Sequence, residues 1–302
     1  MKREVLGTIL ALVAALLSGI AIPINKMFIV DLDPTIFTAV RALFIGIIFF
    51  MISSFKSGFN FKKFKKVSWM YLLAIGVIGG SFAFLMFFSG LKLTTAGRGA
   101  FIHKTLPLYA TLLAFLFLKE KLGKNQLIAL TVMFAGTILI YMSQINPAEF
   151  WTDPSLGDLL ITGATILWAI ESVIAKKAMI KGESNYVVSF ARMFIGAIIL
   201  FSVVLIQSKI NLLFALTQQQ ILSISISIAV LFGFVLSWYW SIKLINVSKA
   251  STLLLLSPVI SLFFGILFFN EPTPFDQILG SALILIGAYF VSRVKSEFET
   301  GV

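Results

Sequence analysis

The sequence predicts an all-α integral membrane protein with ten transmembrane helices, arranged as two inverted repeats of five helices, with both termini in the cytoplasm. Three observations support this fold class. The chain of 302 residues is 59% hydrophobic and 12% charged, which leaves more apolar surface than a soluble domain of this length can bury. Its apolar runs have the length of membrane spans. One such run, with a proline at its centre, occurs twice along the chain.

The duplicated run sets the organisation of the chain. Residues 91–121 read LKLTTAGRGAFIHKTLPLYATLLAFLFLKEK, and residues 242–272 read IKLINVSKASTLLLLSPVISLFFGILFFNEP. The two copies share a proline and a glutamate at an offset of about 151 residues, as Pro107 with Pro258 and Glu120 with Glu271. We therefore predict three parts: a first five-helix repeat over residues 1–145, an outer connecting loop over 146–156, and a second, inverted repeat over 157–302.

Ten hydrophobic runs are long enough to cross a bilayer. They lie at residues 5–25, 34–55, 68–91, 95–118, 125–143, 157–177, 186–207, 219–243, 248–269 and 276–293. Five spans in each repeat make the second copy enter the membrane in the opposite direction, which is an inverted repeat. Within the third span, Gly76 and Gly80 have the spacing of small residues at which helices pack closely.

The basic residues predict which ends face the cytoplasm. With the N-terminus inside, 17 of the 24 lysine and arginine residues fall in inner segments. The outer segments carry only Lys26, Lys92 and Lys209, and the longest outer loop contains Glu149 and Asp153 but no cation. By the positive-inside rule, both termini are cytoplasmic. We predict a multi-pass protein of the cytoplasmic (inner) membrane of a prokaryote.

Composition and motifs argue against several other functions. The chain has no cysteine and one histidine, so we expect no disulfide, no metal site and no metal cofactor. It contains neither a GxxxxGK phosphate loop nor a GxSxG nucleophile elbow, so we expect no enzyme activity and no cofactor. The net charge is +11, but the lysine and arginine residues lie between the apolar runs, where the positive-inside rule expects them. We therefore expect no nucleic-acid partner. The basic segment 56–66 is expected to contact lipid headgroups of the bilayer.

The paired stretches TLPLYATLLAFLFLKEKL and LSPVISLFFGILFFNEP, within two five-span units, resemble the EamA-type transporters of the drug/metabolite transporter superfamily. The resemblance covers nearly the whole chain. It implies a secondary carrier of small metabolites, often an exporter of amino acids or related compounds, with a central cavity between its halves. It does not fix the substrate.

Few ionisable residues lie inside the predicted spans. They are Arg41, Arg98, His103, Lys104, Glu171 and Arg192. Such groups are costly in a membrane and usually face a cavity or one another. Cations outnumber acids among them, which favours a substrate with a carboxylate or other anionic group. A small organic acid or an amino acid fits this charge balance.

Glu171 and Arg192 are predicted to form an ion pair. Each lies about 9 Å from the inner end of its span, and the two spans are consecutive. Such a pair either stabilises the fold or gates the inner side. Arg41 is the approximate counterpart of Arg192 in the first repeat, but Ala21 stands where the partner acid would be. The two halves therefore differ in charge here.

The fourth span carries the residue on which we place most weight for substrate binding. Lys104 lies about 13 Å from the outer surface and shares one helical arc with His103 and Pro107. His103 is either a neutral hydrogen-bonded side chain or a proton relay. Pro107 and Pro258 remove a backbone donor and are expected to kink the fourth and ninth spans.

Further candidate substrate contacts come from four other spans. Small and polar residues follow one face of the first span towards Asn25, and the equivalent face of the sixth span carries a tryptophan and Glu171. The full set of substrate-binding candidates is Lys104, His103, Trp168, Glu171, Arg41, Asn25, Trp238 and Tyr239.

The residues leave other functions open. The first alternative is proton-coupled efflux of cationic drugs with Glu171 as the binding acid, which requires that Arg192 does not hold Glu171. The second is a channel or a membrane protein without transport activity. Kinked, duplicated helices with buried charges argue against a scaffold, and the lack of a continuous polar stripe argues against an open pore. A membrane enzyme fits least well, because no cluster of acids, metal ligands or nucleophiles is present.

Overall fold

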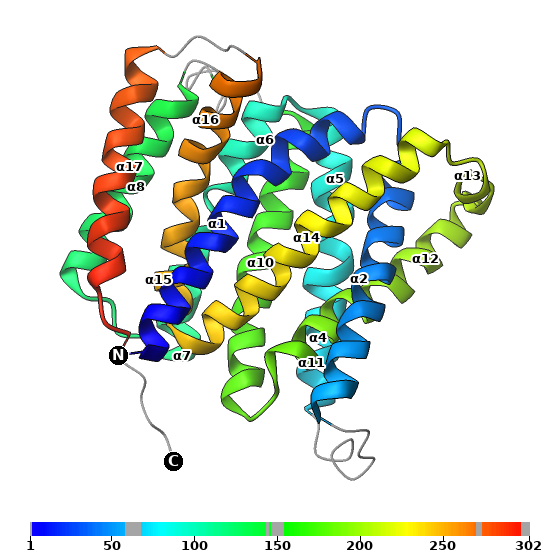
Figure 1. The fold of residues 1–302 in the computed structure, drawn as a ribbon, viewed down its shortest axis with the longest axis horizontal. Coiled ribbons are helices and arrows are strands. Elements are labelled where there is room, and N and C mark those ends of the chain that lie inside the picture. The colour runs from blue at the N-terminus through cyan, green and yellow to red at the C-terminus, as the bar shows by residue number, and fades with distance from the viewer. Residues whose placement is uncertain (1, 58–67, 143–144, 146–153, 270–273, 297–302) are drawn as a thin grey trace.

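The protein is described by a computed structural model that covers residues 2–57, 68–142, 145, 154–269 and 274–296. Within these ranges the regular structure is helical, and ten helices are long and apolar enough to cross a membrane. The predicted ten-helix fold is therefore confirmed (Figure 1). The basic residues at 58–66, most of the predicted loop 146–156 with Glu149 and Asp153, and Glu271 lie outside the described residues.

The helical elements follow the predicted spans closely at both ends. They are α1 (Lys2–Phe28), α2 (Pro34–Ser57), α4 (Trp69–Val77), η1 (Ile78–Phe82), α5 (Ala83–Leu93), α6 (Ala96–His103), α7 (Leu106–Leu118), α8 (Lys124–Tyr141), α10 (Leu156–Ile180), α11 (Asn185–Phe190), η2 (Ala191–Ile195), α12 (Gly196–Ile206), α13 (Ile210–Phe214), α14 (Gln218–Leu244), α15 (Val247–Leu253), η3 (Leu254–Leu256), α16 (Ser257–Phe269) and α17 (Phe275–Arg293).

Four spans are interrupted. The third and seventh each contain a π-helical turn, η1 and η2, and the ninth contains a 3₁₀ turn, η3. The fourth breaks between α6 and α7. Pro107 lies in the first turn of α7 and Pro258 in the first turn of α16. Proline is tolerated in a first turn, where its missing N–H has no helical partner, so each helix is interrupted just before its proline.

The helices of the two predicted halves are interleaved. α1 packs along α14, and α10 packs along α5, so the first helix of each half lies against the third helix of the other. α1 and α10 cross the bundle in opposite directions, as an inverted repeat requires (Figure 1). α1 begins and α17 ends at the same end of the bundle, where the backbone N–H of Ser296 donates to Glu4 at 3.1 Å. The side of the membrane that this end faces stays a prediction.

Glycines allow helices to touch at two crossings. At the first, α8 meets α17, and a Cβ on Gly136 or Gly280 would lie 2.5 Å from the carbonyl oxygen of the other glycine. At the second, η1 meets η2, and a Cβ on Gly80 would clash with the carbonyl oxygen of Arg192. Gly76, one turn away, lies against Ile195 in the same way. The predicted packing role of Gly76 and Gly80 is confirmed.

Two lysines, Lys26 half-buried and Lys176 buried, close the ends of helices in equivalent places. Nζ of Lys26 donates to the carbonyl oxygens of Leu91 and Thr94 at 2.5 and 2.8 Å, where α5 ends. Lys176 occupies the equivalent position on α10, and its Nζ donates to two carbonyl oxygens at the end of α14 at 2.6 and 3.1 Å. Carbonyl groups at helix ends lack partners within the helix, and these lysines provide them.

Replacing Gly80 with alanine is expected to destabilise the protein by about 1–3 kcal/mol, because the added methyl group meets backbone that cannot rotate away. Gly123→Ala is the matched control, since no atom lies within 4 Å of a Cβ built there. Thermal unfolding of both purified variants in detergent measures the difference. Equal melting temperatures would contradict the tight crossing.

Candidate functional site

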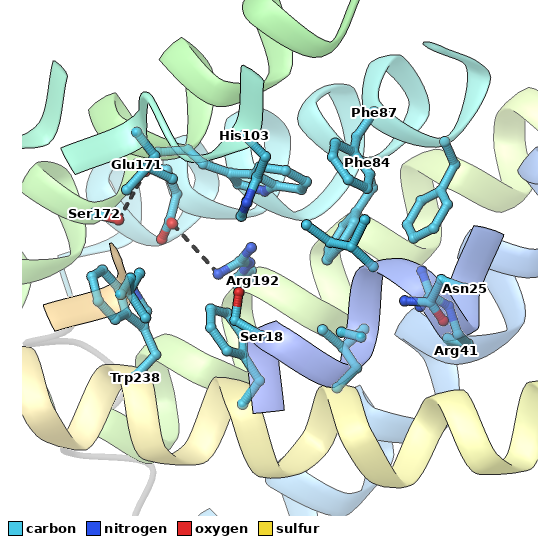
Figure 2. Close-up of a pocket in the computed structure, with 18 residues that line it drawn as sticks. Ser18, Asn25, Arg41, Phe84, Phe87, His103, Glu171, Ser172, Arg192 and Trp238 are labelled. Carbon is cyan, nitrogen blue, oxygen red and sulfur yellow. Dashed lines mark hydrogen bonds and ion pairs between the residues drawn. The ribbon is translucent and has the colours of Figure 1, made fainter. Parts of the chain in front are cut away.

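A cavity lies among helices of both predicted halves. It contains about 750 Å³ of space free of protein atoms, counted with its open mouth. Its lining combines three charged side chains with a histidine and six large aromatic rings (Figure 2). These residues are Arg41, Glu171, Arg192, His103, Phe84, Phe87, Phe88, Trp168, Phe234 and Trp238. Such a mixture of an apolar wall and a few placed polar groups is typical of small-molecule sites.

Glu171 is held by two neighbours. Its Oε1 accepts a hydrogen bond from the hydroxyl of Tyr239, and its Oε2 lies 3.6 Å from Nη1 of Arg192. Nη1 of Arg192 also donates to the Tyr239 hydroxyl at 3.1 Å. The carboxylate is fully buried, so this three-residue cluster compensates a charge that would otherwise be very costly.

The backbone explains how the cluster is assembled. Glu171 lies on α10, Arg192 on the π turn η2, and Tyr239 on α14. A Cβ on Gly79 would clash with Cγ of Glu171, so this glycine lets α10 approach η1. The clash of a Cβ on Gly80 with the Arg192 carbonyl has the same effect on η2. Two adjacent glycines therefore set the distance between the acid and the arginine.

Arg41 is fixed in a different way, by aromatic rings and neutral oxygens. Its guanidinium carbon lies 4.0 Å from the ring centre of Phe37 and 4.5 Å from that of Phe88. Its Nε donates to the carbonyl oxygen of Phe37 at 3.2 Å, and its Nη1 donates to the hydroxyl of Ser227 at 2.8 Å. Within the described ranges, no carboxylate lies within 4 Å of this guanidinium. The stacking and hydrogen bonds hold the cation in place without cancelling its charge.

Asn25 belongs to the same group. Ser227 donates to Oδ1 of Asn25 at 2.6 Å, so one serine on α14 joins Asn25 of α1 to Arg41 of α2. Figure 2 shows Asn25 and Arg41 together at one end of the cavity and Glu171 with Ser172 at the other. The cavity therefore has an end with an uncompensated cation and an end with a compensated acid.

An aromatic wall lies between these ends. The ring of His103 packs edge-on against Trp168, with ring centres 5.4 Å apart. The ring of Phe87 is tilted against the same indole, with ring centres 5.1 Å apart. The indole N–H of Trp168 donates to the carbonyl oxygen of Gly79 at 3.0 Å. Trp238 stacks on Phe234 with centres 6.3 Å apart. The wall offers ring faces and edges to an apolar group of a ligand.

Lys104 and Tyr239 are the two substrate-binding candidates that do not line the cavity. Lys104 ends α6, is 2% exposed, and its Nζ donates to the Ser18 hydroxyl at 3.0 Å. The same Nζ lies 3.5 Å from Nδ1 of His103. Ser18 and His103 both line the cavity, so Lys104 reaches it through these two side chains. Tyr239 reaches it through Glu171 and Arg192.

The structure adds residues that the sequence reasoning did not single out. Ser227 lies in the alternating run SISIS at 223–227, and nothing in that run distinguishes it from its neighbouring serines. Phe37 and Phe88 are two of 31 phenylalanines. Helical spacing does place Phe37 one turn before Arg41, which was an available signal. Arg98 lies apart from the cavity and forms an ion pair with Asp158 at 2.5 Å.

Glu171→Gln and Arg192→Gln are each expected to impair transport and lower stability, because each leaves a buried group without its partner. The double variant should lose less than the sum of the two single losses, by about 0.5–3 kcal/mol of coupling in thermal unfolding. The matched control is Asn185→Ala, which truncates a buried side chain outside the cluster. Combined with either variant, its loss of stability should simply add to that of the variant. Additive losses for the Glu171 and Arg192 pair would argue that the two residues act separately.

Comparison with known proteins identifies the family. The sequence profile described as the EamA-like transporter family matches residues 5–142 and 155–293. The chain is 27% identical over 291 residues to the uncharacterized transporter YyaM of Bacillus subtilis, covering 93% of this chain and 91% of that protein. It is 25% identical over 282 residues to an uncharacterized transporter of Archaeoglobus fulgidus, covering 92% and 95%.

A solved crystal structure has the same fold. It superimposes with a TM-score of 0.72 at 18% sequence identity and covers 94% of this chain and 95% of that chain. The ten helices, the two successive matches to one family profile and the transporter relatives agree with one another. The chain belongs to the EamA-like transporter family, and it is a multi-pass membrane transporter.

Proposed function

We propose that this transporter is a secondary carrier that exports small organic anions, such as amino acids or organic acids, across the cytoplasmic membrane by alternating access. Both termini lie in the cytoplasm in this proposal. The observation that carries it is the guanidinium of Arg41, which lines the cavity with no carboxylate within 4 Å among the described residues. Glu171, the one carboxylate among the described residues that line the cavity, already has Arg192 and Tyr239 as partners.

Arg41 is suited to receive a carboxylate. A guanidinium offers several N–H donors in a fixed plane, and a carboxylate can accept two of them at once. In this cavity Nε and Nη1 have protein partners, and the stacking of Phe37 and Phe88 fixes the plane. Binding then requires little reordering of the arginine, which favours affinity.

The aromatic wall suggests what the rest of the substrate looks like. Trp168, Phe84 and Phe87 form a continuous apolar surface, with ring centres 5.1–5.4 Å from the indole. Such a surface favours a substrate whose anionic group carries an apolar or aromatic portion. A compact, fully polar acid would leave this surface without a partner.

The alternative of cationic drug efflux is less well supported. That function needs an acid free to bind a cation, and Glu171 lies 3.6 Å from Nη1 of Arg192. The cavity lining carries two arginines and one glutamate. Proton coupling belongs to the main proposal, with His103 and Glu171 as the cavity groups able to change charge. Flux driven by an imposed pH gradient in proteoliposomes tests it.

Arg41→Gln is expected to weaken binding of carboxylate substrates by about 10-fold to 100-fold, because one charge-assisted contact is lost. Arg41→Lys should retain part of the affinity. The measurement is saturable flux in proteoliposomes, after a thermal-shift screen of amino acids, organic acids and cationic drugs has found a ligand. Stabilisation by cations alone, unaffected by Arg41→Gln, would contradict an anion carrier. Flux that does not saturate would indicate a channel.

Lys104→Met keeps the length and apolar bulk of the side chain and removes the charge. We expect the variant to fold and insert normally and to bind carboxylate substrates more weakly. The loss should be smaller than that of Arg41→Gln, because Lys104 acts through Ser18 and His103. Lys104→Arg should recover part of the loss. Unchanged flux and ligand stabilisation in Lys104→Met would assign the lysine to structure alone.

A further inference from the structure

The predicted repeat places two equivalent pairs of helices at opposite ends of the bundle. One is α7 of the first half against α15 of the second, and the other is α16 of the second half against α6 of the first. Figure 1 shows the first contact near the end that holds the N-terminus and the second towards the opposite end. At an offset of about 151 residues, each position of one contact has a counterpart in the other.

The contact between α7 and α15 is closed. All seven residues of α15 are at most 1% exposed. α7, which packs against both α15 and α10, buries Pro107, Ala110, Thr111 and Ala114 along one face. A small-residue face on α7 lets α15 approach without a gap.

The equivalent contact between α16 and α6 is open. A second cavity, of about 1450 Å³ with its mouth, lies between the two helices and is also lined by α1 and α8. On the α16 side it is lined by Pro258, Ser261, Leu262 and Gly265. These four residues are the counterparts of the four buried α7 positions. On the α6 side it is lined by Ala96, Gly97 and Ala100, which are the counterparts of Val247, Ser248 and Ser251 on α15.

The ionic contacts beside the two helix pairs do not account for this difference. Lys249 of α15 pairs with Glu4 of α1 at 2.7 Å, and Arg98 of α6 pairs with Asp158 of α10 at 2.5 Å. In each case the fourth helix of one half pairs with the first helix of the other. Both ends therefore keep their ion pair, although one end is closed and the other is open.

A carboxylate lies directly on the closed contact. Glu120, which follows α7, is 7% exposed. Its Oε1 accepts from the backbone N–H of Val247 at 2.7 Å. Its Oε2 accepts from the backbone N–H and the hydroxyl of Ser248, at 3.0 and 2.6 Å. Charge-assisted hydrogen bonds of this kind are among the stronger ones in proteins, and all three join α7 to the start of α15.

We propose that Glu120 is a positioning residue of the transport cycle, which holds this end of the path closed while the opposite end, between α6 and α16, is open. The proposal rests on the alternating access of the proposed function, and not on the substrate. When the carboxylate leaves Val247 and Ser248, α15 can separate from α7. Removing the carboxylate then shifts the population towards the state that is open at the Glu120 end.

The test uses single cysteines in a chain that has none of its own. Ser251→Cys reports on the closed contact, and its counterpart Ala100→Cys reports on the open one. A membrane-impermeant maleimide is applied to right-side-out and to inverted membrane vesicles. In the parent background we expect Ala100→Cys to react from the side opposite Glu120 and Ser251→Cys to be protected from both sides.

Adding Glu120→Gln should raise the labelling rate of Ser251→Cys about tenfold or more from the Glu120 side, because the amide has no charge and only one acceptor oxygen for the three donors. Labelling of Ala100→Cys should fall at the same time. Glu120→Asp should restore part of the protection. Glu183→Gln is the matched control, because Glu183 accepts from the backbone N–H of Ser68 at 2.8 Å, away from α7 and α15, and it should change neither rate.

Unchanged rates at both cysteines would overturn the proposal. Faster labelling of both would mean that the variant loosens the whole bundle, which also overturns it. If Glu120→Gln does not insert, Ser248→Ala removes one of the three bonds and should shift both rates in the same directions by a smaller factor. Unchanged labelling rates in that variant would refute the proposed role of Glu120. The assay needs no substrate, so failure of the proposed anion specificity would appear in flux and ligand stabilisation and leave these rates as they are.

Discussion

A buried carboxylate inside a membrane has to be compensated, and the compensation of Glu171 sets the character of the cavity. Arg192 and the Tyr239 hydroxyl occupy this carboxylate. The acid that would otherwise balance the charge of Arg41 is therefore already paired with Arg192. What remains for a ligand is the cationic end with Arg41, together with the aromatic wall. The glycines at positions 79 and 80 are part of this constraint, because they permit the close approach of α10, η1 and η2 on which the ion pair depends.

Much of this architecture could be predicted from sequence because the membrane imposes simple rules. A span must be apolar over a fixed length, so ten runs gave ten helices. Depth along a span follows from residue counting, which put Glu171 and Arg192 at one level, where they lie 3.6 Å apart. Proline removes a backbone donor and disfavours the interior of a helix, so the interruptions before Pro107 and Pro258 could also be predicted.

Other features depend on rotation and packing, which residue counting does not give. Lys104 was placed at a suitable depth, but the helix ends at this residue and its amine turns to Ser18 behind the lining. The π turns leave no trace in hydropathy, although η2 carries Arg192. The sequence also did not predict that α7 and α15 are in close contact while a cavity lies between α16 and α6. The two copies differ at single positions, such as Thr111 and Leu262, and hydropathy at these positions does not indicate which copy is closed.

The lysines that close the ends of α5 and α14 bear on how the chain is built. The last carbonyl groups of a helix have no partner within it, and where protein and lipid limit the access of water they need a donor from elsewhere in the protein. Lys26 and Lys176 supply it from the first helix of each half, and both precede in sequence the helix that they cap. During synthesis from the N-terminus, the donor has therefore entered the membrane before its acceptors emerge. Each half can complete its third helix as it is inserted, without waiting for the other half to be made.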